Sequence, residues 1–253
     1  MAARNAGVPT STIERDYVQN WLLANLKDQN LALKGGTGIR KAFIPDYRFS
    51  DDLDFTIMKK VDLEAIRKLL SDAIERARNA SGIPFETASD PRENRNGFVM
   101  DVFFRMLLSG HSRLKVKLDI SKSSVDDHLL PLIIKKIIHP YSDHCDADVM
   151  VYSLEEMAAE KVRSVFQRTR ARDLFDVHLL IVGRRIDIGI LNGILRRKFE
   201  KRSVDADVTM IRARKAQFRS GWMRSLHHQM KDIPDFEQVF GEVLSEIGQL
   251  QLS

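Results

Sequence analysis

The sequence predicts an α+β fold followed by a helical region. Residues 1–150 mix helical periodicity with strand-like alternation of apolar and polar side chains, whereas residues 151–253 are helical almost throughout. Hydrophobic residues make up 43% of the 253 positions and charged residues 30%, which is typical of a folded chain with a sizeable core. We therefore expect two domains, an α+β core over 1–150 and a helical domain over 151–253.

The first predicted elements surround a glycine turn. Residues 12–28 carry apolar side chains at helical spacing and predict a helix. Residues 31–34 form a short approach to the turn at Gly35 and Gly36. This turn opens a second predicted helix over 37–43.

A strand, a helix and a hairpin are expected next. Residues 52–58 alternate as a strand, and residues 62–80 have the apolar spacing of an amphipathic helix. Residues 97–108 and 113–121 predict two strands of a hairpin. We expect residues 124–150 to be irregular.

The cysteine content and the distribution of charge indicate a cellular compartment and a class of partner. The single cysteine, Cys145, excludes an internal disulfide and favours a reducing cytoplasm, and no apolar run is long enough to predict a membrane span. Residues 184–231 hold 13 Lys/Arg against 4 Asp/Glu, which leaves 27 against 31 elsewhere. A basic C-terminal third beside a mildly acidic remainder favours a polyanion such as RNA as partner, although solvated helix faces would give the same composition.

Two carboxylates on the 52–58 strand are the main candidate site. Asp52 and Asp54 are two residues apart, so they point to the same face, while Leu53 and Phe55 point to the other. A cation relieves the repulsion between such carboxylates, and Mg²⁺, or Mn²⁺ in its place, suits a pair that shares it with substrate phosphates. The alternative is an exposed polar face with Arg or Lys partners.

The glycine turn and a second strand add to this site. Gly35 and Gly36 lack a Cβ, so the backbone can approach a phosphate, and the helix that begins near Thr37 would attract an anion. On the 113–121 strand, Asp119 would join the pair if the two strands lie side by side. An ordinary turn and a solvent-facing Asp119 are the alternatives.

A charged helical segment follows. On one continuous helix over 153–180, Lys161, Arg168, Arg172 and Asp176 would share a sector. Lys161 and Arg168 are candidates to bind triphosphate oxygens. Asp173 and Asp176 are candidates either to orient those cations or to contact a base or ribose. A ladder of salt bridges within the helix is the alternative.

These segments together resemble a known family. KGGTGIRKAF, RFSDDLDF, KLDIS and AAEKVRSVFQRTRARDLFDVHLL span residues 34–180 and are similar to the AbiEii/AbiGii toxin family of nucleotidyltransferases, which includes MenT-type toxins of type IV toxin–antitoxin and abortive-infection systems. The resemblance implies a DNA-polymerase-β-like nucleotidyltransferase core. It implies a phosphate-binding turn at Gly35, Gly36 and Thr37, metal ligands at Asp52 and Asp54 with Asp119 as third acid, and functional residues at Lys161, Asp173 and Asp176.

The resemblance also implies an activity. We expect Mg²⁺-dependent transfer of a nucleoside monophosphate from a nucleoside triphosphate to an RNA acceptor, with the 3′ end of tRNA as the expected acceptor and growth arrest, countered by a cognate antitoxin, as the outcome. The motifs do not separate this from a phosphotransferase acting on a protein such as the antitoxin. The third hypothesis is a non-catalytic RNA- or nucleotide-binding module.

Overall fold

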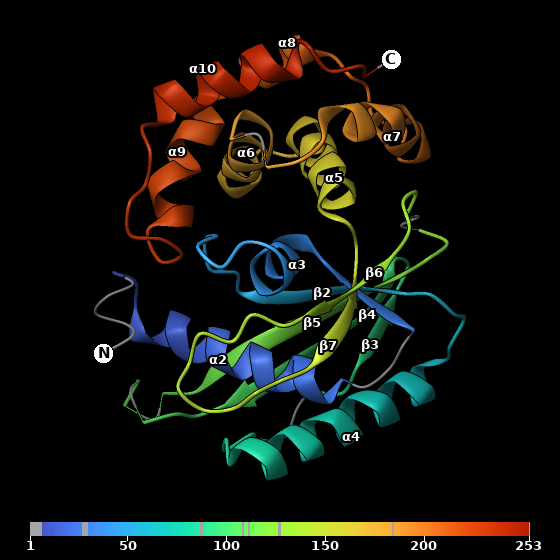
Figure 1. The fold of residues 1–253 in the computed structure, drawn as a ribbon, viewed down its shortest axis with the longest axis vertical. Helices are drawn as coiled ribbons and strands as arrows, with labels where there is room; N and C mark the ends of the chain where they lie inside the picture. The colour runs from blue at the N-terminus through green and yellow to red at the C-terminus, as the bar shows by residue number, and fades with distance from the viewer. Residues whose placement is uncertain are drawn as a thin grey trace. The chain divides into compact units, whose positions relative to one another are not determined.

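The N-terminal part of the chain is organised around one mixed β-sheet. The structure is a computed structural model, and it describes residues 7–26, 30–86, 89–107, 109–110, 112–125, 128–183 and 185–252. Within them the chain divides into two compact units, Met1–Tyr152 and Ser153–Ser253. The first unit contains seven described strands in the order β3-β4-β5-β2-β1-β7-β6. The second unit is helical (Figure 1).

The centre of the sheet carries the residues singled out from the sequence. Strand β2 (Asp52–Ile57) lies between β1 (Leu31–Lys34), to which it is antiparallel, and β5 (Leu114–Lys122), to which it is parallel. Strand β4 (Gly97–Phe104) pairs antiparallel with β5, which confirms the predicted hairpin, although β4 ends earlier than predicted. Strand β3 (Arg92–Asn94) forms the edge beside β4.

The expectation of irregular structure over 124–150 is wrong. The segment contains β6 (Ile133–Lys136), and β7 (Asp148–Val151) begins within it. The two strands pair with each other in antiparallel fashion, and β7 lies parallel to β1. Residues 31–34, expected as a simple approach to the turn, are likewise a strand, β1, and all four of its residues are buried.

Among the described residues of this unit, three helices accompany the sheet. Helix α2 (Thr10–Asn25) and helix α4 (Leu63–Ser81) lie side by side, and α3 (Gly35–Ala42) follows β1 directly (Figure 1). All three were predicted, although residues 27 and 28 of the first predicted helix lie outside the described residues. Asp62 caps α4 by accepting from the Ala65 N–H, and Gly82 ends it in the left-handed conformation.

The core of the first unit follows from strand alternation. Leu53 and Phe55 of β2 and Leu118 and Ile120 of β5 are buried, whereas the residues between them are half-exposed. Because neighbouring strands are in register, the apolar side chains form one buried face and the polar ones gather on the other.

The second unit consists of consecutive helices. These are α5 (Leu154–Gln167), α6 (Ala171–Val177), the π-helix η1 (His178–Val182), α7 (Ile188–Lys201), α8 (Val208–Ala213), α9 (Lys215–Leu226) and α10 (Phe236–Ile247). Its core is rich in aromatic contacts, such as the edge-to-face pairs Phe166–Phe199 and Trp222–Phe236, whose ring centroids lie 5.1 and 5.5 Å apart. No helix among the described residues is long and apolar enough to cross a membrane.

Candidate active site

The glycine turn packs directly against one of the two strand carboxylates. Gly35 follows β1 with φ +68°, a left-handed conformation that favours glycine. A Cβ added to Gly35 would lie 2.4 Å from Oδ2 of Asp54. A Cβ on Gly36 would lie 3.0 Å from Oγ of Ser50. The absence of side chains therefore lets the turn and the carboxylate occupy adjacent space.

Thr37 connects the turn to the other carboxylate residue. Its side chain is fully buried, and its hydroxyl donates a short hydrogen bond to the main-chain carbonyl of Asp52. The hydroxyl thus holds the beginning of β2 against α3. The N–H groups in the first turn of α3 lack partners within the helix, so the main chain is the part of this segment suited to an anion.

The sheet places the predicted acids together. Asp52 and Asp54 share one side of β2, and in the parallel register with β5 Asp54 lies opposite Asp119 while Asp52 lies opposite Lys117. All four side chains are half-exposed. The pairing of the two strands, which the sequence left open, therefore brings Asp119 beside the Asp52–Asp54 pair.

Lys117 is a site residue to which the sequence analysis gave no role. Its Nζ donates to Oδ2 of Asp119 at 2.9 Å. Burial alone would lower the pKa of Lys117, but the hydrogen bond to Asp119 and the charges of Asp119, Asp52 and Asp54 raise it above the usual lysine value. The alternation of β5 placed Lys117 on the carboxylate face, and that was the available signal. A protonated lysine thus partly neutralises the acids.

The donor set fits a metal ion shared with a substrate. Within the described part of the chain, no three Asp, Glu, His or Cys side chains are grouped so that they could hold a metal ion by themselves. Asp52 and Asp54 nevertheless offer carboxylate oxygens on one strand face, beside the close approach of Gly35. Mg²⁺ commonly takes one or two carboxylates and completes its shell with water and substrate phosphates.

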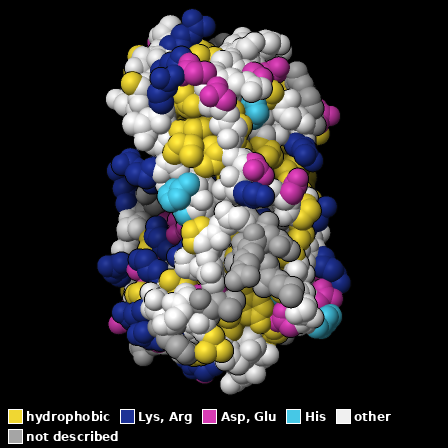
Figure 2. All heavy atoms as spheres, turned by 90° about the vertical axis from the view of Figure 1, so that its left-hand side faces the viewer, with side chains coloured by type: hydrophobic (Ala, Val, Ile, Leu, Met, Phe, Trp, Pro, Cys, Tyr) yellow, Lys and Arg dark blue, Asp and Glu magenta, His cyan; other side chains and the backbone are white. Residues whose placement is uncertain are grey.

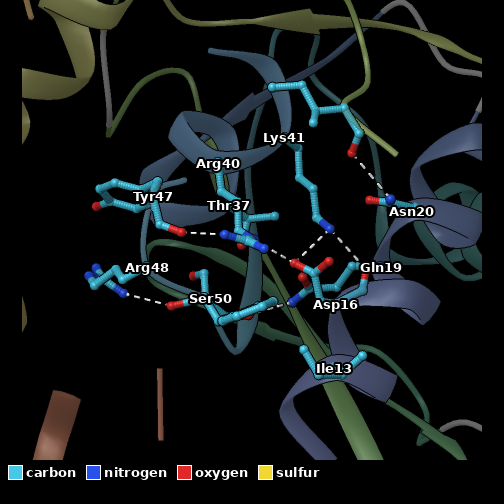
Figure 3. A network of polar contacts seen from close by, with 12 residues as sticks. Ile13, Asp16, Gln19, Asn20, Thr37, Arg40, Lys41, Tyr47, Arg48 and Ser50 are labelled. Atoms are coloured by element: carbon cyan, nitrogen blue, oxygen red, sulfur yellow. Dashed lines mark hydrogen bonds and ion pairs between the residues drawn. The ribbon is translucent and has the colours of Figure 1, made fainter. Parts of the chain in front are cut away.

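A buried ionic network fixes the helix that follows the turn (Figure 3). Asp16 of α2 accepts from Nε of Arg40 at 2.7 Å and pairs with Nζ of Lys41 at 2.8 Å. Burial would raise the pKa of Asp16, but Lys41 and Arg40 lower it, while burial lowers the pKa of Lys41 to about 8. Gln19 donates to the main-chain carbonyl of Ser50 at 2.9 Å. These contacts hold α2, α3 and the approach to β2 together.

A second charged cluster lies in the helical unit. Lys161 Nζ pairs with Asp176 at 2.7 Å and with Asp173 at 3.1 Å, and Arg168 Nε pairs with Asp173 at 2.7 Å. Burial alone would raise the pKa of Asp173, but Lys161 and Arg168 hold it well below its usual range. The structure therefore brings Lys161, Arg168, Asp173 and Asp176 together within this unit.

The continuous helix over 153–180, on which the shared sector of charges depended, does not form. Helix α5 ends at Gln167, Arg168 is extended with φ −150° and ψ 159°, and α6 begins only at Ala171. Two contacts support the break: Arg168 reaches Asp173, and Nη1 of Arg214 donates to the carbonyl of Phe166 at 2.7 Å. Because the helix breaks, the shared sector that a continuous helix would give does not exist, and tertiary contacts assemble the cluster instead.

Comparison with known proteins places this geometry in context. Residues 18–245 match the family described as "Nucleotidyl transferase AbiEii toxin, Type IV TA system". No curated protein sequence matches the chain.

Several solved structures resemble the chain. It is 19% identical to JHP933 from Helicobacter pylori, with a TM-score of 0.63, over 96% of this chain and 93% of that one. It is 17% identical to MenT4, a nucleotidyltransferase toxin from Mycobacterium tuberculosis, with a TM-score of 0.57, over 98% of this chain and 88% of that one. At such identities these likenesses show the fold, and they confirm the α+β class.

Proposed function

Because the chain belongs to the AbiEii family of type IV nucleotidyltransferase toxins, we propose that it transfers a nucleoside monophosphate from a nucleoside triphosphate to an RNA acceptor. The 3′ end of tRNA is the acceptor that we propose, in the cytoplasm. Growth arrest would follow, and a cognate antitoxin would counter it. The observation that carries the proposal is the contact of the Gly35 turn with Asp54, since it sets a backbone suited to a phosphate beside a carboxylate suited to a metal ion.

The residues of the first unit have distinct roles in this proposal. Asp52 and Asp54 would hold Mg²⁺, and the main chain at Gly36 and Thr37 would bind phosphate oxygens. A metal ion held there would supply positive charge to neutralise the triphosphate. Asp119 would accept the proton of the attacking hydroxyl, and Lys117, which donates to it, would orient its carboxylate.

The charged cluster of the second unit would bind substrate charge. We propose that Lys161 and Arg168 contact phosphate oxygens and stabilise the charge that develops on them. Asp173 and Asp176, which are 2% and 0% exposed, hold these cations in place. Removing Asp173 would remove an ion pair from each cation, and removing Asp176 would leave Lys161 with its longer contact to Asp173, so both acids are positioning residues.

Labelled triphosphates test the reaction. The protein is incubated with Mg²⁺, total RNA and each of the four nucleoside triphosphates, labelled at the α- or the γ-phosphate. We expect α-label in RNA. Label from the γ-phosphate on protein would instead identify the phosphotransferase, and folded protein that labels no RNA would overturn the proposal.

A matched pair of variants tests the site. Asp54→Asn keeps the shape of the side chain but removes a metal-binding charge, and we expect transfer to fall at least about 100-fold. Asp51→Asn is the control, because Asp51 pairs with Arg15 at 2.9 Å. Its transfer rate should stay near that of the wild type. Equal rates in both variants, with circular dichroism showing both folded, would contradict the assignment of Asp54.

Growth on induced expression tests the biological role. We expect induction of the wild type to stop growth, induction of Asp54→Asn to leave it unaffected, and co-expression of a regulator-like neighbouring gene to restore it. Toxicity that persists in folded Asp54→Asn would show that the effect does not depend on catalysis.

A further inference from the structure

One buried arginine of the helical unit is unusual. Arg163 of α5 is only 7% exposed, and its Nε has no hydrogen-bond partner among the residues that the structure describes. A buried donor of this kind costs free energy when it is left unpaired, and the cost is larger for a charged group. Such an atom in a folded protein calls for an explanation, and one explanation is a ligand.

The surroundings of Arg163 are rich in positive charge. Burial is the main reason that the pKa of Arg163 is lowered. The charge of Glu160 raises this pKa, and the charges of Arg202 and Arg168 lower it. Glu160 also pairs with Lys198, whose Nζ lies 3.3 Å from Oε1 of Glu160. Arg202 and Arg168 therefore lie near Arg163, while Glu160 offsets part of their repulsion and Asp173 pairs with Arg168. A bound anion would relieve the repulsion that remains.

Helix packing explains why these residues meet. Helices α5 and α7 pack against each other in the helical unit, and their C-terminal turns are joined by the edge-to-face contact of Phe166 and Phe199 (Figure 1). Arg163 lies three residues before Phe166, and Arg202 lies three residues after Phe199. Arg168 and Arg202 are the C-cap residues of the two helices.

The cluster extends from the interior to the surface. Arg163 is buried, Arg202 is half-exposed and Arg168 is exposed. Arg214 already donates to the carbonyl of Phe166 at the end of α5. A helix C-terminus attracts cations, but Arg163 lies a full turn before that end, so this attraction does not account for its position.

The chemistry of the cluster favours a phosphate. Guanidinium groups bind phosphate oxygens through paired, planar hydrogen bonds, and several of them around one group suit an anion with more than one charged oxygen. On the face drawn in Figure 2, Lys and Arg side chains gather in several separate groups with other side chains between them. This face is therefore not uniformly basic.

We propose that Arg163 and Arg202, at the paired C-terminal turns of α5 and α7, form a binding site for a backbone phosphate of the acceptor RNA. The proposal rests on the proposed function, for which it supplies a contact to the acceptor. Arg202 would meet the phosphate at the surface, and the buried Arg163 would complete its hydrogen bonds through this ligand.

Binding of a fluorescent hairpin RNA with a single-stranded 3′ end tests the site. Arg163→Gln and Arg202→Gln should each weaken binding about tenfold, because a hydrogen bond to a charged group is lost. Each should also reduce the slope of log affinity against log salt by about 0.7 to 0.9, the share of one phosphate. Arg196→Gln is the control, since Arg196 lies on the same helix α7 and pairs with Glu200 at the surface, and its RNA affinity should not change.

Further measurements separate the competing explanations. The KM for the nucleoside triphosphate should stay constant in Arg163→Gln and Arg202→Gln. A raised KM with unchanged RNA affinity would show that the phosphate belongs to the triphosphate, and wild-type RNA affinity in folded variants would show that the cluster serves the fold. Both results would overturn the inference. If the protein transfers no nucleotide but both variants bind RNA more weakly, the proposed function fails and the phosphate site stands.

Discussion

Replacing Gly35 with alanine tests whether the turn and the carboxylate act as one structure. Gly35 has φ +68°, and a Cβ there would lie 2.4 Å from Oδ2 and 3.2 Å from Cγ of Asp54. Gly82, which ends α4, has almost the same φ of +69° but no atom within 4 Å of its would-be Cβ. Gly82→Ala therefore carries the same backbone penalty without the contact with Asp54.

The two substitutions differ in their expected effects. A left-handed conformation costs a non-glycine residue about 1–2 kcal/mol, so both variants should lose about this much free energy of unfolding. In Gly35→Ala, the carboxylate oxygen must also move by about 1 Å to lengthen the contact from 2.4 Å to the ordinary 3.4 Å. A displacement of about 1 Å in a catalytic group can reduce the rate about 100-fold.

The assay compares stability and activity for each variant. Denaturant unfolding gives the free energy of unfolding, and initial rates of α-label transfer to RNA give the activity. We expect Gly82→Ala to transfer within about twofold of the wild type and Gly35→Ala to transfer about 100-fold more slowly. A folded Gly35→Ala protein that transfers at the wild-type rate would refute the reasoning. So would a Gly82→Ala variant with an equal loss of activity, because the effect would then come from stability.

Two further predictions concern the charges around the sheet and in the helical unit. The pKa values of Asp16 and Asp173 are lowered from 3.8 in the folded protein, so the stability that they contribute is present above about pH 4 and is lost as the pH falls further. The free energy of unfolding should therefore be constant from pH 7 to 5 and decrease below pH 4. A free energy of unfolding that stays constant down to pH 2.5 would contradict this prediction. Lys117→Met removes a cation from the Asp119 face and should tighten Mg²⁺ binding about tenfold in calorimetric titration. Lys115→Met on the same strand is the control, because Lys115 pairs with Asp101 at 3.0 Å, and equal affinities in the two variants would show that Lys117 does not compete with the metal ion.

The sequence predicted those helices and strands whose signals lie in neighbouring residues. The amphipathic helix α4 has its own cap residues, Asp62 and Gly82, and β2 alternates clearly, so neighbouring residues alone define both. Strands β6 and β7 have four residues each, which is too short for a period to be seen. They are strands because β7 pairs with β1, more than 100 residues earlier in the chain, and this pairing leaves no local signal.

In the candidate site, too, the sequence predicted what depends on local geometry and not what depends on tertiary contacts. The sequence indicated that Asp52 and Asp54 share a face, because that depends only on strand geometry. The position of Asp119 opposite Asp54 depends on register between β2 and β5, which the sequence could state only as a condition. The break in the helix at Arg168 has no Gly or Pro to mark it, and the ion pair with Asp173, five residues later, accompanies it.

Thr37 shows how a motif can be recognised for its chemistry while its side chain serves the structure. The Gly-Gly-Thr turn suggests three contributors to phosphate binding, but the Thr37 hydroxyl is buried against the carbonyl of Asp52. Gly35 meets the Asp54 side chain, and Thr37 meets the Asp52 main chain, so the turn touches both acidic residues of β2. The turn therefore fixes where the carboxylates stand, and the contacts that it can still offer to a phosphate are main-chain N–H groups. A substitution such as Thr37→Val would then act on the position of β2, and a loss of metal binding in that variant would follow from geometry even though Thr37 is not a ligand.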